Sequence, residues 1–212
     1  MRNPWLDIPL SDYEGHMALP QVDQSRMLSD QLAAALAAHR PRSVALVGCA
    51  GGNGFERIDP DLTSRVVGVD INPDYLSAAR RRFDGVFECL ELVCADAQSS
   101  DLAFEPVELV FAGLIFEYAD PRALLRNLAA RVRSGGVLAA VLQMPTPGKT
   151  EVTPTPFTSL QKLAPIMALL PPEELIGEAR VAGLTLSSAR RLNLPSGKRF
   201  QSLMFLVPGK PV

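Results

Sequence analysis

Residues 43–54 read SVALVGCAGGNG, a short apolar run followed by a cluster of glycines. The run at 43–48 is rich in aliphatic and β-branched side chains, which is typical of a strand buried on both faces. From Gly48 onward the sequence predicts a tight turn, because backbone without a Cβ can bend sharply and approach a ligand closely. We expect a helix to begin after the turn, with its first N–H groups facing negative or electron-rich groups. The stretch therefore predicts a ligand-binding turn at the carboxyl end of a buried strand.

Strands and helices alternate on both sides of this stretch. An amphipathic helix is expected over residues 23–39. Further strands are expected at 65–70, 86–94, 107–112 and 137–142. Asn72 and Asp120 each precede a proline, which indicates that helices begin there, and the second helix is expected to carry Val132 on its buried face. This alternation predicts an α/β fold with a doubly wound, mostly parallel sheet.

The last third of the chain has a different character. Seven prolines interrupt residues 144–172, which predicts an inserted, lid-like segment with one short helix around 159–169. A final helix is expected at 173–182. The apolar stretches 184–194 and 200–207 flank a turn, which predicts an antiparallel hairpin at the end of the chain.

The overall composition disfavours several classes of function. The 212 residues are 47% hydrophobic and carry a net charge of -2, so a packed fold is expected and neither nucleic acid nor anionic lipid is an expected partner. Three cysteines without a CxxC pair favour a reduced, cytoplasmic location, and the first ten residues lack the apolar core of a secretory signal. No apolar run approaches the roughly 20 residues of a bilayer span, so a soluble protein is expected. His16 and His39 lack metal-ligand spacing to another histidine or cysteine, so no metal is expected.

Two aspartates follow strands near the glycine-rich turn. Asp70 ends the second strand, 22 residues beyond Gly48, where an acid can accept hydrogen bonds from both hydroxyls of an adenosine ribose. Asp96 follows the third strand, where a carboxylate can accept from the adenine amine while the N–H of Ala97 faces a ring nitrogen. The alternatives are a helix cap for Asp70 and an Asx-turn for Asp96. Together, the turn and the acids indicate a nucleoside-containing cofactor.

These segments, in this order, resemble the class I S-adenosylmethionine-dependent methyltransferases of the small bacterial type. The matching segments are 44–54 (VALVGCAGGNG), 67–72 (VGVDIN), 93–97 (VCADA), 107–120 (VELVFAGLIFEYAD) and 128–141 (LAARVRSGGVLAAV). The resemblance implies a seven-stranded sheet that ends in the antiparallel hairpin. It also implies a Rossmann-like domain at 43–212, with its insertion at about 144–172, preceded by an N-terminal lid segment and helix at 1–42.

The resemblance implies a set of contacts to S-adenosylmethionine. In it, Asp70 binds the ribose hydroxyls, Ile71 packs on the adenine, and Asp96 and Ala97 contact the adenine edge. The turn backbone holds the methionine end, through Gly48, Cys49, Ala50 and Gly52. Phe111 and Ala112 flank the sulfonium, and Tyr13 contacts the cofactor from the lid segment.

The glycine motif departs from the family at two positions. The family places an acid two residues before the first glycine to bind the methionine ammonium, and this chain has Leu46 there. The ammonium must then meet backbone carbonyls at Gly48 or Ala112, or a group from the N-terminal segment. Ala50 replaces the middle glycine, which a backbone in an ordinary region accommodates.

The expected activity is transfer of a methyl group to a small-molecule acceptor, whose identity the sequence does not reveal. A base is needed only if the acceptor atom must lose a proton. The candidates are Glu117 and Tyr118 after the fourth strand and His16 near the start, and residues without a catalytic role are the alternative. Two other functions stay open: a nicotinamide-dependent oxidoreductase, which the hairpin and Asp96 disfavour, and a cofactor-binding module without transferase chemistry.

Overall fold

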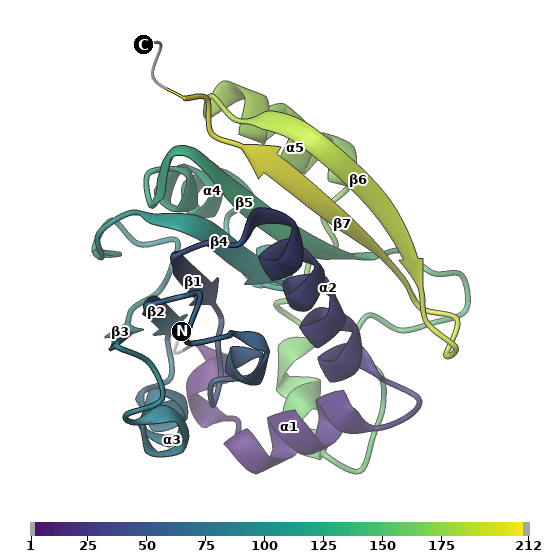
Figure 1. Cartoon of the computed structure of the whole chain (residues 1–212). Helices are drawn as coiled ribbons and strands as arrows, with labels where there is room; N and C mark the ends of the chain where they lie inside the picture. Colours follow the sequence, from purple (N-terminus) through teal and green to yellow (C-terminus); the bar gives the residue numbers. More distant parts are fainter. Residues whose placement is uncertain (1–2, 210–212) are drawn as a thin grey trace.

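A computed structural model describes residues 3–209, so residues 1–2 of the expected N-terminal segment and residues 210–212 lie outside the description. Seven strands form one sheet in the order β3-β2-β1-β4-β5-β7-β6 (Figure 1). The strands are β1 (Ser43–Val47), β2 (Arg65–Asp70), β3 (Cys89–Cys94), β4 (Val107–Gly113), β5 (Val132–Met144), β6 (Thr185–Asn193) and β7 (Arg199–Leu206). The first five run parallel, and β7 pairs antiparallel with both β5 and β6. The predicted α/β fold with its C-terminal hairpin is confirmed.

Helices cover both faces of the sheet. They are α1 (Leu10–Ala18), α2 (Gln24–His39), α3 (Pro73–Phe83), α4 (Pro121–Ala129) and α5 (Pro172–Val181). Residues of α2 and α3 share one apolar core with the sheet, and residues of α4 and α5 share the other. Asn72 caps α3 and Asp120 caps α4 through their side-chain oxygens, as predicted.

Strand β1 is buried on both faces because its side chains alternate between the two cores. Val44 and Leu46 belong to the core under α2, whereas Ala45 and Val47 belong to the core under α4 and α5. Chain order reverses beside β1, since β2 lies on one side and β4 on the other. In a doubly wound sheet this reversal opens a crevice at the carboxyl ends of the strands.

Three local expectations were wrong, and a fourth, the short helix around 159–169, was right in place but not in type or length. The glycine-rich turn leads into a single 3-10 turn, η2 (Phe55–Arg57), because the glycines favour turn conformations and Pro60 soon follows, so no α-helix start faces a ligand there. Val132 begins β5 instead of lying on α4, and a bulge with Gly135 at φ +78° follows it. Strand β3 begins at Cys89, since residues 84–88 form a turn around Gly85 at φ +72°. The insertion contains only a six-residue 3-10 helix, η4 (Thr158–Leu163).

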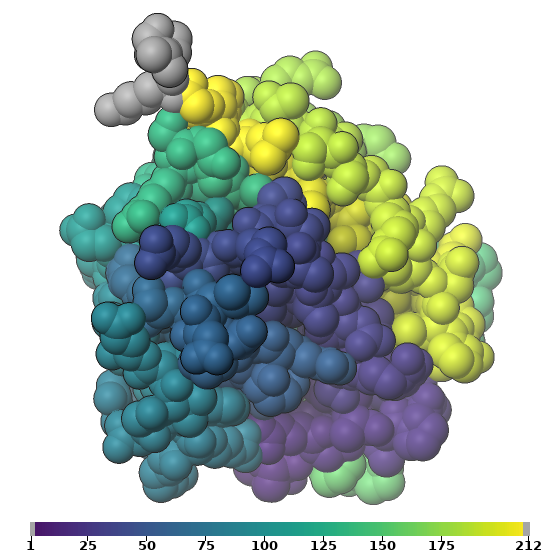
Figure 2. All heavy atoms as spheres, in the orientation of Figure 1, coloured from purple at the N-terminus to yellow at the C-terminus, as the bar shows by residue number. Residues whose placement is uncertain are grey.

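The N-terminal segment and the insertion lie together at the carboxyl edge of the sheet. The 3-10 helix η1 (Pro4–Asp7) and α1 both contact η4, and Figure 1 shows α1 and η4 below the sheet. A Cβ on Gly15 of α1 would lie 2.4 Å from the Phe157 ring, so α1 and the insertion are closely packed there and a larger residue would displace the ring. In Figure 2 the N-terminal atoms adjoin the green atoms of the insertion. Among residues 3–209, no helix has the length and apolar character to cross a bilayer.

Candidate active site

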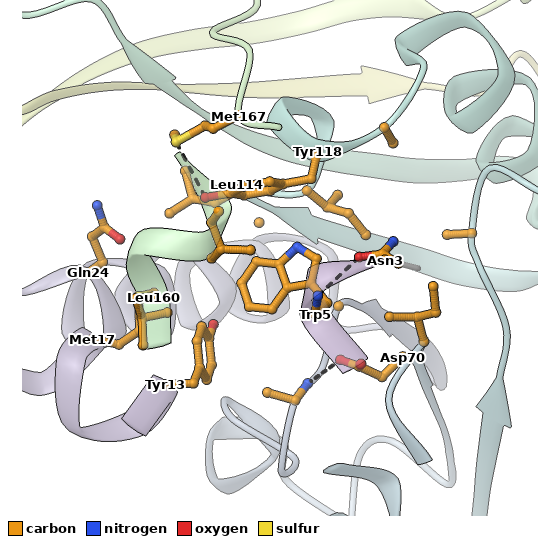
Figure 3. A pocket seen from close by; sticks show the side chains of 18 of the residues that line it. Asn3, Trp5, Tyr13, Met17, Gln24, Asp70, Leu114, Tyr118, Leu160 and Met167 are labelled. Carbon is orange, nitrogen blue, oxygen red and sulfur yellow. Dashed lines mark hydrogen bonds between the residues drawn. The ribbon is translucent and has the colours of Figure 1, made fainter. Parts of the chain in front are cut away.

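One cavity opens at the carboxyl ends of β1, β2 and β4, and most of the predicted site residues line it (Figure 3). From the expected cofactor set it contains Gly48, Ala50, Asp70, Ile71, Asp96, Ala97 and Tyr13. His16 and Tyr118, two of the proposed catalytic residues, also line it. Residues from both ends of the chain and from the insertion thus meet at the edge where the sequence predicted a site.

Asp70 ties the glycine-rich turn to the start of α3. Its carboxylate accepts hydrogen bonds from the backbone N–H of Ala50 at 2.8 Å and of Asn72 at 2.9 Å. Only 8% of the residue is exposed, and this burial raises its pKa to about 6. The two carboxylate oxygens together offer about four acceptor positions, so the side chain can still accept from a ligand hydroxyl.

The turn has a left-handed backbone at four alternate residues, of which Ala50 is the one that is not glycine. Gly48 has φ +73° and Ala50 has φ +48°, so the expected ordinary backbone at Ala50 was wrong. A left-handed alanine costs about 1 kcal/mol, and its N–H is the one that reaches Asp70. Leu114, which follows β4 and lines the same cavity, also has a positive φ, +56°. Of the four non-glycine residues with a positive φ among the described residues, two therefore line the cavity.

Asp96 and Ala97 extend this part of the cavity beneath β3. Asp96 accepts hydrogen bonds from the backbone N–H of Gln98 at 3.2 Å and from its side-chain amide at 3.0 Å. This is the Asx-type turn considered as the alternative, and it leaves the side chain facing the cavity. We call Asp70, Ile71, Asp96 and Ala97 the aspartate end.

Aromatic side chains from the N-terminal segment fill the middle of the cavity. Trp5 packs edge-on against Tyr13, with ring centroids 5.7 Å apart, and against Tyr118 at 5.2 Å. Tyr13 stacks on Tyr75, whose hydroxyl donates to the Ile8 carbonyl. The sequence analysis missed Trp5 and Tyr75. The single tryptophan of the chain, placed in the expected lid segment, was the available signal for Trp5.

The part of the cavity beneath β5 and β7 is polar. His16, Gln24, Gln143, Thr153 and Lys198 line it, and we call these residues the polar end. Gln24 donates to Gln143 at 3.3 Å, and the ring Nδ1 of His16 lies 2.9 Å from the hydroxyl of a neighbouring threonine, Thr155. Burial, followed by the charge of Lys198, lowers the pKa of His16, which keeps its imidazole neutral at pH 7. Apart from His16, the sequence analysis assigned no role to these residues.

Five predicted site residues lie outside this cavity. Cys49 and Phe111 line a neighbouring hollow, Gly52 lines neither space, and Ala112 is fully buried in the core under α4. Gly113 and Leu114, the next residues along the chain, line the cavity where Ala112 was expected. Contacts of these residues to a cofactor stay a prediction.

Glu117, the fifth of these residues, is 1% exposed, and its hydrogen bonds hold neighbouring segments together. One carboxyl oxygen accepts from the Gln143 N–H at 2.6 Å, and its backbone carbonyl accepts from the Ala168 N–H at 2.8 Å. The other carboxyl oxygen has no hydrogen-bond partner among the described residues. Burial raises the pKa of Glu117 to about 7. These contacts connect β5 to the insertion and hold Gln143 in place.

Tyr118 lines the cavity but its hydroxyl is engaged. The hydroxyl lies 3.3 Å from the Met167 sulfur, and burial raises the pKa of the phenol well above its ordinary value. A phenol that resists ionisation is a poor proton acceptor, so this environment favours a packing role.

The neighbouring hollow lies under the glycine-rich turn and shares Tyr13 and Gly48 with the cavity. Leu46, which occupies the family's acid position, lines the hollow with an apolar side chain. Two carboxylates line it as well, those of Glu14 and Glu56. Both carboxylates lie near the glycine-rich turn, which was expected to hold the methionine part of the cofactor.

Both carboxylates belong to contacts that hold other elements on the turn. Glu14 pairs with Arg82 of α3 at 2.5 Å, and Arg82 also donates to the Gly51 carbonyl at 3.1 Å. Glu56 accepts from the Gly54 N–H at 2.9 Å and from Ser29 of α2 at 3.4 Å.

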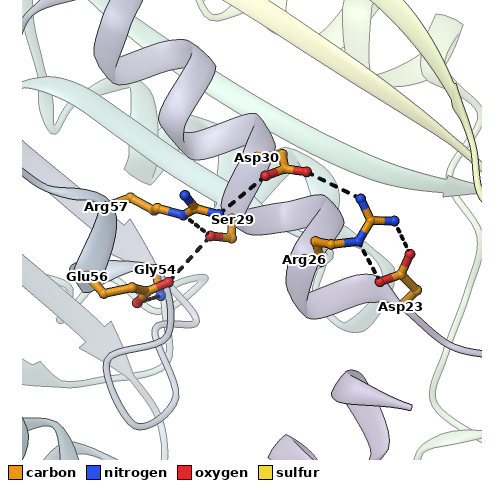
Figure 4. A network of polar contacts seen from close by, with 7 residues as sticks. All are labelled: Asp23, Arg26, Ser29, Asp30, Gly54, Glu56 and Arg57. Carbon is orange, nitrogen blue, oxygen red and sulfur yellow. Dashed lines mark hydrogen bonds and ion pairs between the residues drawn. The ribbon is translucent and has the colours of Figure 1, made fainter. Parts of the chain in front are cut away.

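Arg57 continues this second set of contacts along α2. It donates to Ser29 at 2.5 Å and pairs with Asp30, as Figure 4 shows. These exposed contacts are individually weak, and their role is to dock α1, α2 and α3 around the turn.

The comparison with known families decides the class of the domain. The model of a methyltransferase domain family matches residues 46–140, the span from β1 through most of β5. The match covers a little under half of the 212 residues. The matched segment includes the carboxyl ends of β1, β2 and β4, which form the cavity.

Known relatives agree with the fold. A trans-aconitate 2-methyltransferase from Methylobacterium nodulans is 29% identical over 139 residues, which are 64% of this chain and 51% of the relative. The chain thus spans about half the length of that curated relative. The N-methyltransferase NodS from Bradyrhizobium japonicum, solved with S-adenosyl-L-homocysteine, has a TM-score of 0.69 at 16% identity, covering 98% of this chain and 100% of its own. A magnesium protoporphyrin IX methyltransferase from Synechocystis has a TM-score of 0.69 at 13% identity, covering 92% of each chain. The fold is that of the class I methyltransferases.

Proposed function

We propose that this protein transfers a methyl group from S-adenosylmethionine to a small-molecule acceptor. The observation that carries the proposal is the aspartate end: a buried carboxylate, Asp70, opens into the same cavity as Asp96 and the glycine-rich turn. Asp70 would accept from the ribose hydroxyls, Ile71 would pack on the adenine, and Asp96 with Ala97 would contact its edge. The methyltransferase domain match at 46–140 supports this assignment.

The amino-acid end of the cofactor would lie by the glycine-rich turn. Its ammonium needs a negative or carbonyl partner, and Leu46 supplies none. The turn carbonyls and the carboxylates of Glu14 and Glu56 are the acceptors that line the hollow there. Of the two carboxylates, Glu56 has no arginine partner among the described residues, so we assign the ammonium to Glu56.

Bound S-adenosylmethionine supplies a methyl carbon made electrophilic by the adjacent sulfonium. The methyl group is displaced in line, so the attacking atom must lie opposite the sulfur. The protein therefore has to align the acceptor and exclude water. Trp5, Tyr13 and Tyr118 provide an aromatic cover over the cavity. We propose that residues 1–42 and the insertion at about 144–172 act together as this cover over the domain at 43–212. If the acceptor carries a proton, His16 is the candidate base, because it lines the cavity and its lowered pKa keeps it neutral.

Leu46 also supports a second candidate, a cofactor-binding module without transferase activity. Its side chain belongs to the apolar core, so the usual acid is replaced by a structural residue. Both candidates bind the cofactor, but only the methyltransferase converts it to S-adenosylhomocysteine. The separate rival, a nicotinamide-dependent oxidoreductase, would bind NADH.

Turnover with methyl-labelled S-adenosylmethionine tests the proposal. Three groups of acceptors are supplied: carboxylic acids such as trans-aconitate, amines, and phenols. Formation of S-adenosylhomocysteine is measured for wild type and for Asp70→Ala. We expect turnover by wild type, loss of it in the variant, and no NADH binding by fluorescence titration. Binding of S-adenosylhomocysteine without turnover for any group would favour the binding module, and absence of binding would overturn both.

We also propose a reducing, cytoplasmic location and no nucleic-acid partner. Cys49, Cys89 and Cys94 are all free thiols, and two of them are exposed. The net charge of -2 supports small-molecule chemistry over a phosphate backbone.

A further inference from the structure

Lys198 is a buried cation with no matching anion. It stands in the turn between β6 and β7, is 4% exposed, and lines the cavity. Its ammonium donates to the backbone carbonyl of Glu151 at 2.7 Å, and no carboxylate lies within 4 Å of it among residues 3–209. Burial lowers its pKa to about 8, although the more distant Glu151 carboxylate acts in the opposite direction. An ammonium has three N–H donors, so two remain for a ligand.

Further hydrogen-bonding capacity surrounds this cation. Thr153 lines the cavity, and its buried hydroxyl has no hydrogen-bond partner within the described part of the chain. His16 uses its Nδ1 toward Thr155, which leaves Nε2 as a second polar atom. Buried polar groups are normally paired, so a hydroxyl without a partner and a cation without a carboxylate, lining the same cavity, indicate that a ligand completes them.

Positive charge continues outward from this point. Lys198 and Gln143 also line a surface hollow whose wall carries Lys149 and Arg199. Glu151 is the single acid among the residues of that hollow. A concave surface of one predominant sign raises the local concentration of oppositely charged small molecules.

We propose that the polar end is the acceptor subsite and that it selects a small carboxylic acid, held by Lys198 and Thr153. This inference rests on the proposed transfer of a methyl group. In the reaction, a carboxylate oxygen forms the new O–CH3 bond, the S–CH3 bond breaks, and its electron pair stays on sulfur. No proton is transferred, so the products are a methyl ester and S-adenosylhomocysteine, and no general base is required. His16 then serves as a positioning residue through Nε2.

The test is calorimetric titration of acids into protein saturated with S-adenosylhomocysteine. The probes are succinate, citrate and benzoate, each compared with its neutral amide. We expect at least one acid to bind at least tenfold more tightly than its amide. Lys198→Met should weaken that acid at least tenfold, and Lys198→Arg should restore part of the affinity. Lys162→Met, at an exposed lysine outside the cavity, is the matched control and should change nothing.

Thr153→Val keeps the proposal testable if Lys198→Met fails to fold. The hydroxyl has no partner to lose, so this variant should be at least as stable as wild type while binding the acid about three- to tenfold more weakly. Equal binding of acid and amide, unchanged acid affinity in Lys198→Met and Thr153→Val, or absence of acid binding by protein that binds S-adenosylhomocysteine would each overturn the inference. Absence of S-adenosylhomocysteine binding would instead count against the proposed function. With labelled S-adenosylmethionine, the transferred methyl should be released as methanol in mild base, as an ester requires.

Discussion

The two ends of the cavity are assembled in different ways. At the aspartate end, each residue lies at the end of a strand or within three residues of it, and the two strands concerned, β2 and β3, are neighbours in the sheet. At the polar end, the residues come from α1, α2, β5, the insertion and the C-terminal hairpin, far apart in the sequence. The first is fixed by the sheet itself. The second depends on packing between elements that are distant in the sequence, so only the first could be predicted from local sequence patterns.

Glu117→Gln should produce the largest change in the free energy of unfolding. Glu117 belongs to the polar-end side of the comparison because it holds the backbone of Gln143. Folding raises the pKa of Glu117 from 4.5 to about 7, so the folded protein holds a proton that the unfolded chain releases. The stability from this proton is fully present below pH 4.5 and is lost as pH rises to about 7. Glutamine does not ionise, so the variant should match wild type near pH 4 and exceed it by about 3 kcal/mol at pH 8.

Urea unfolding at a series of pH values measures this difference. Asp70 contributes its own loss between pH 3.8 and about 6 in both proteins, so it cancels in the comparison. Parallel stability curves for Glu117→Gln and wild type would show that Glu117 is ionised in the folded protein, contrary to the buried anchor described here.

Glu56→Gln should separate the methionine part of the cofactor from the adenosine part. If the Glu56 carboxylate meets the ammonium, the variant should bind S-adenosylhomocysteine about tenfold more weakly, as expected for one hydrogen bond to a charged group. It should bind 5'-methylthioadenosine, which lacks the amino-acid end, as wild type does. Glu88→Gln changes the net charge equally at an exposed site outside both spaces and is the control. Equal weakening of both ligands would assign Glu56 to the fold of the turn.

Ala50→Gly should have the smallest effect, because it relieves the left-handed alanine without touching a ligand contact. We expect stabilisation by about 1 kcal/mol or less, since the gain in backbone freedom of the unfolded chain offsets part of the relief. Ala112→Gly makes the same substitution in buried β4 at an ordinary φ and should destabilise by about 1 kcal/mol or more. Thermal unfolding of the two variants measures whether each one is more or less stable than wild type. Destabilisation by Ala50→Gly would contradict the strain at this position.

Prediction from the sequence succeeded where a residue's position follows from a strand. The pattern at 65–70 placed Asp70 at a strand end, and the glycines placed the turn beside it, so the aspartate end was predictable. The left-handed Ala50 was not, because a favourable contact, its N–H to Asp70, holds a backbone that alanine itself disfavours. Lys198 had no signal either, since a lysine in a Pro-Ser-Gly-Lys turn is ordinarily solvated. Its burial depends on the insertion that folds against it.

Affinity for S-adenosylhomocysteine, measured by calorimetry in wild type, Asp70→Ala and Lys198→Met, tests the division between the two ends most directly. Removing the acceptor of two ribose hydroxyls should weaken binding at least 30-fold, about 2 kcal/mol. Lys198→Met should stay within twofold of wild type, because Lys198 faces the acceptor. Circular dichroism confirms that each variant is folded. Unchanged affinity in Asp70→Ala, or an equal loss in both variants, would contradict this account.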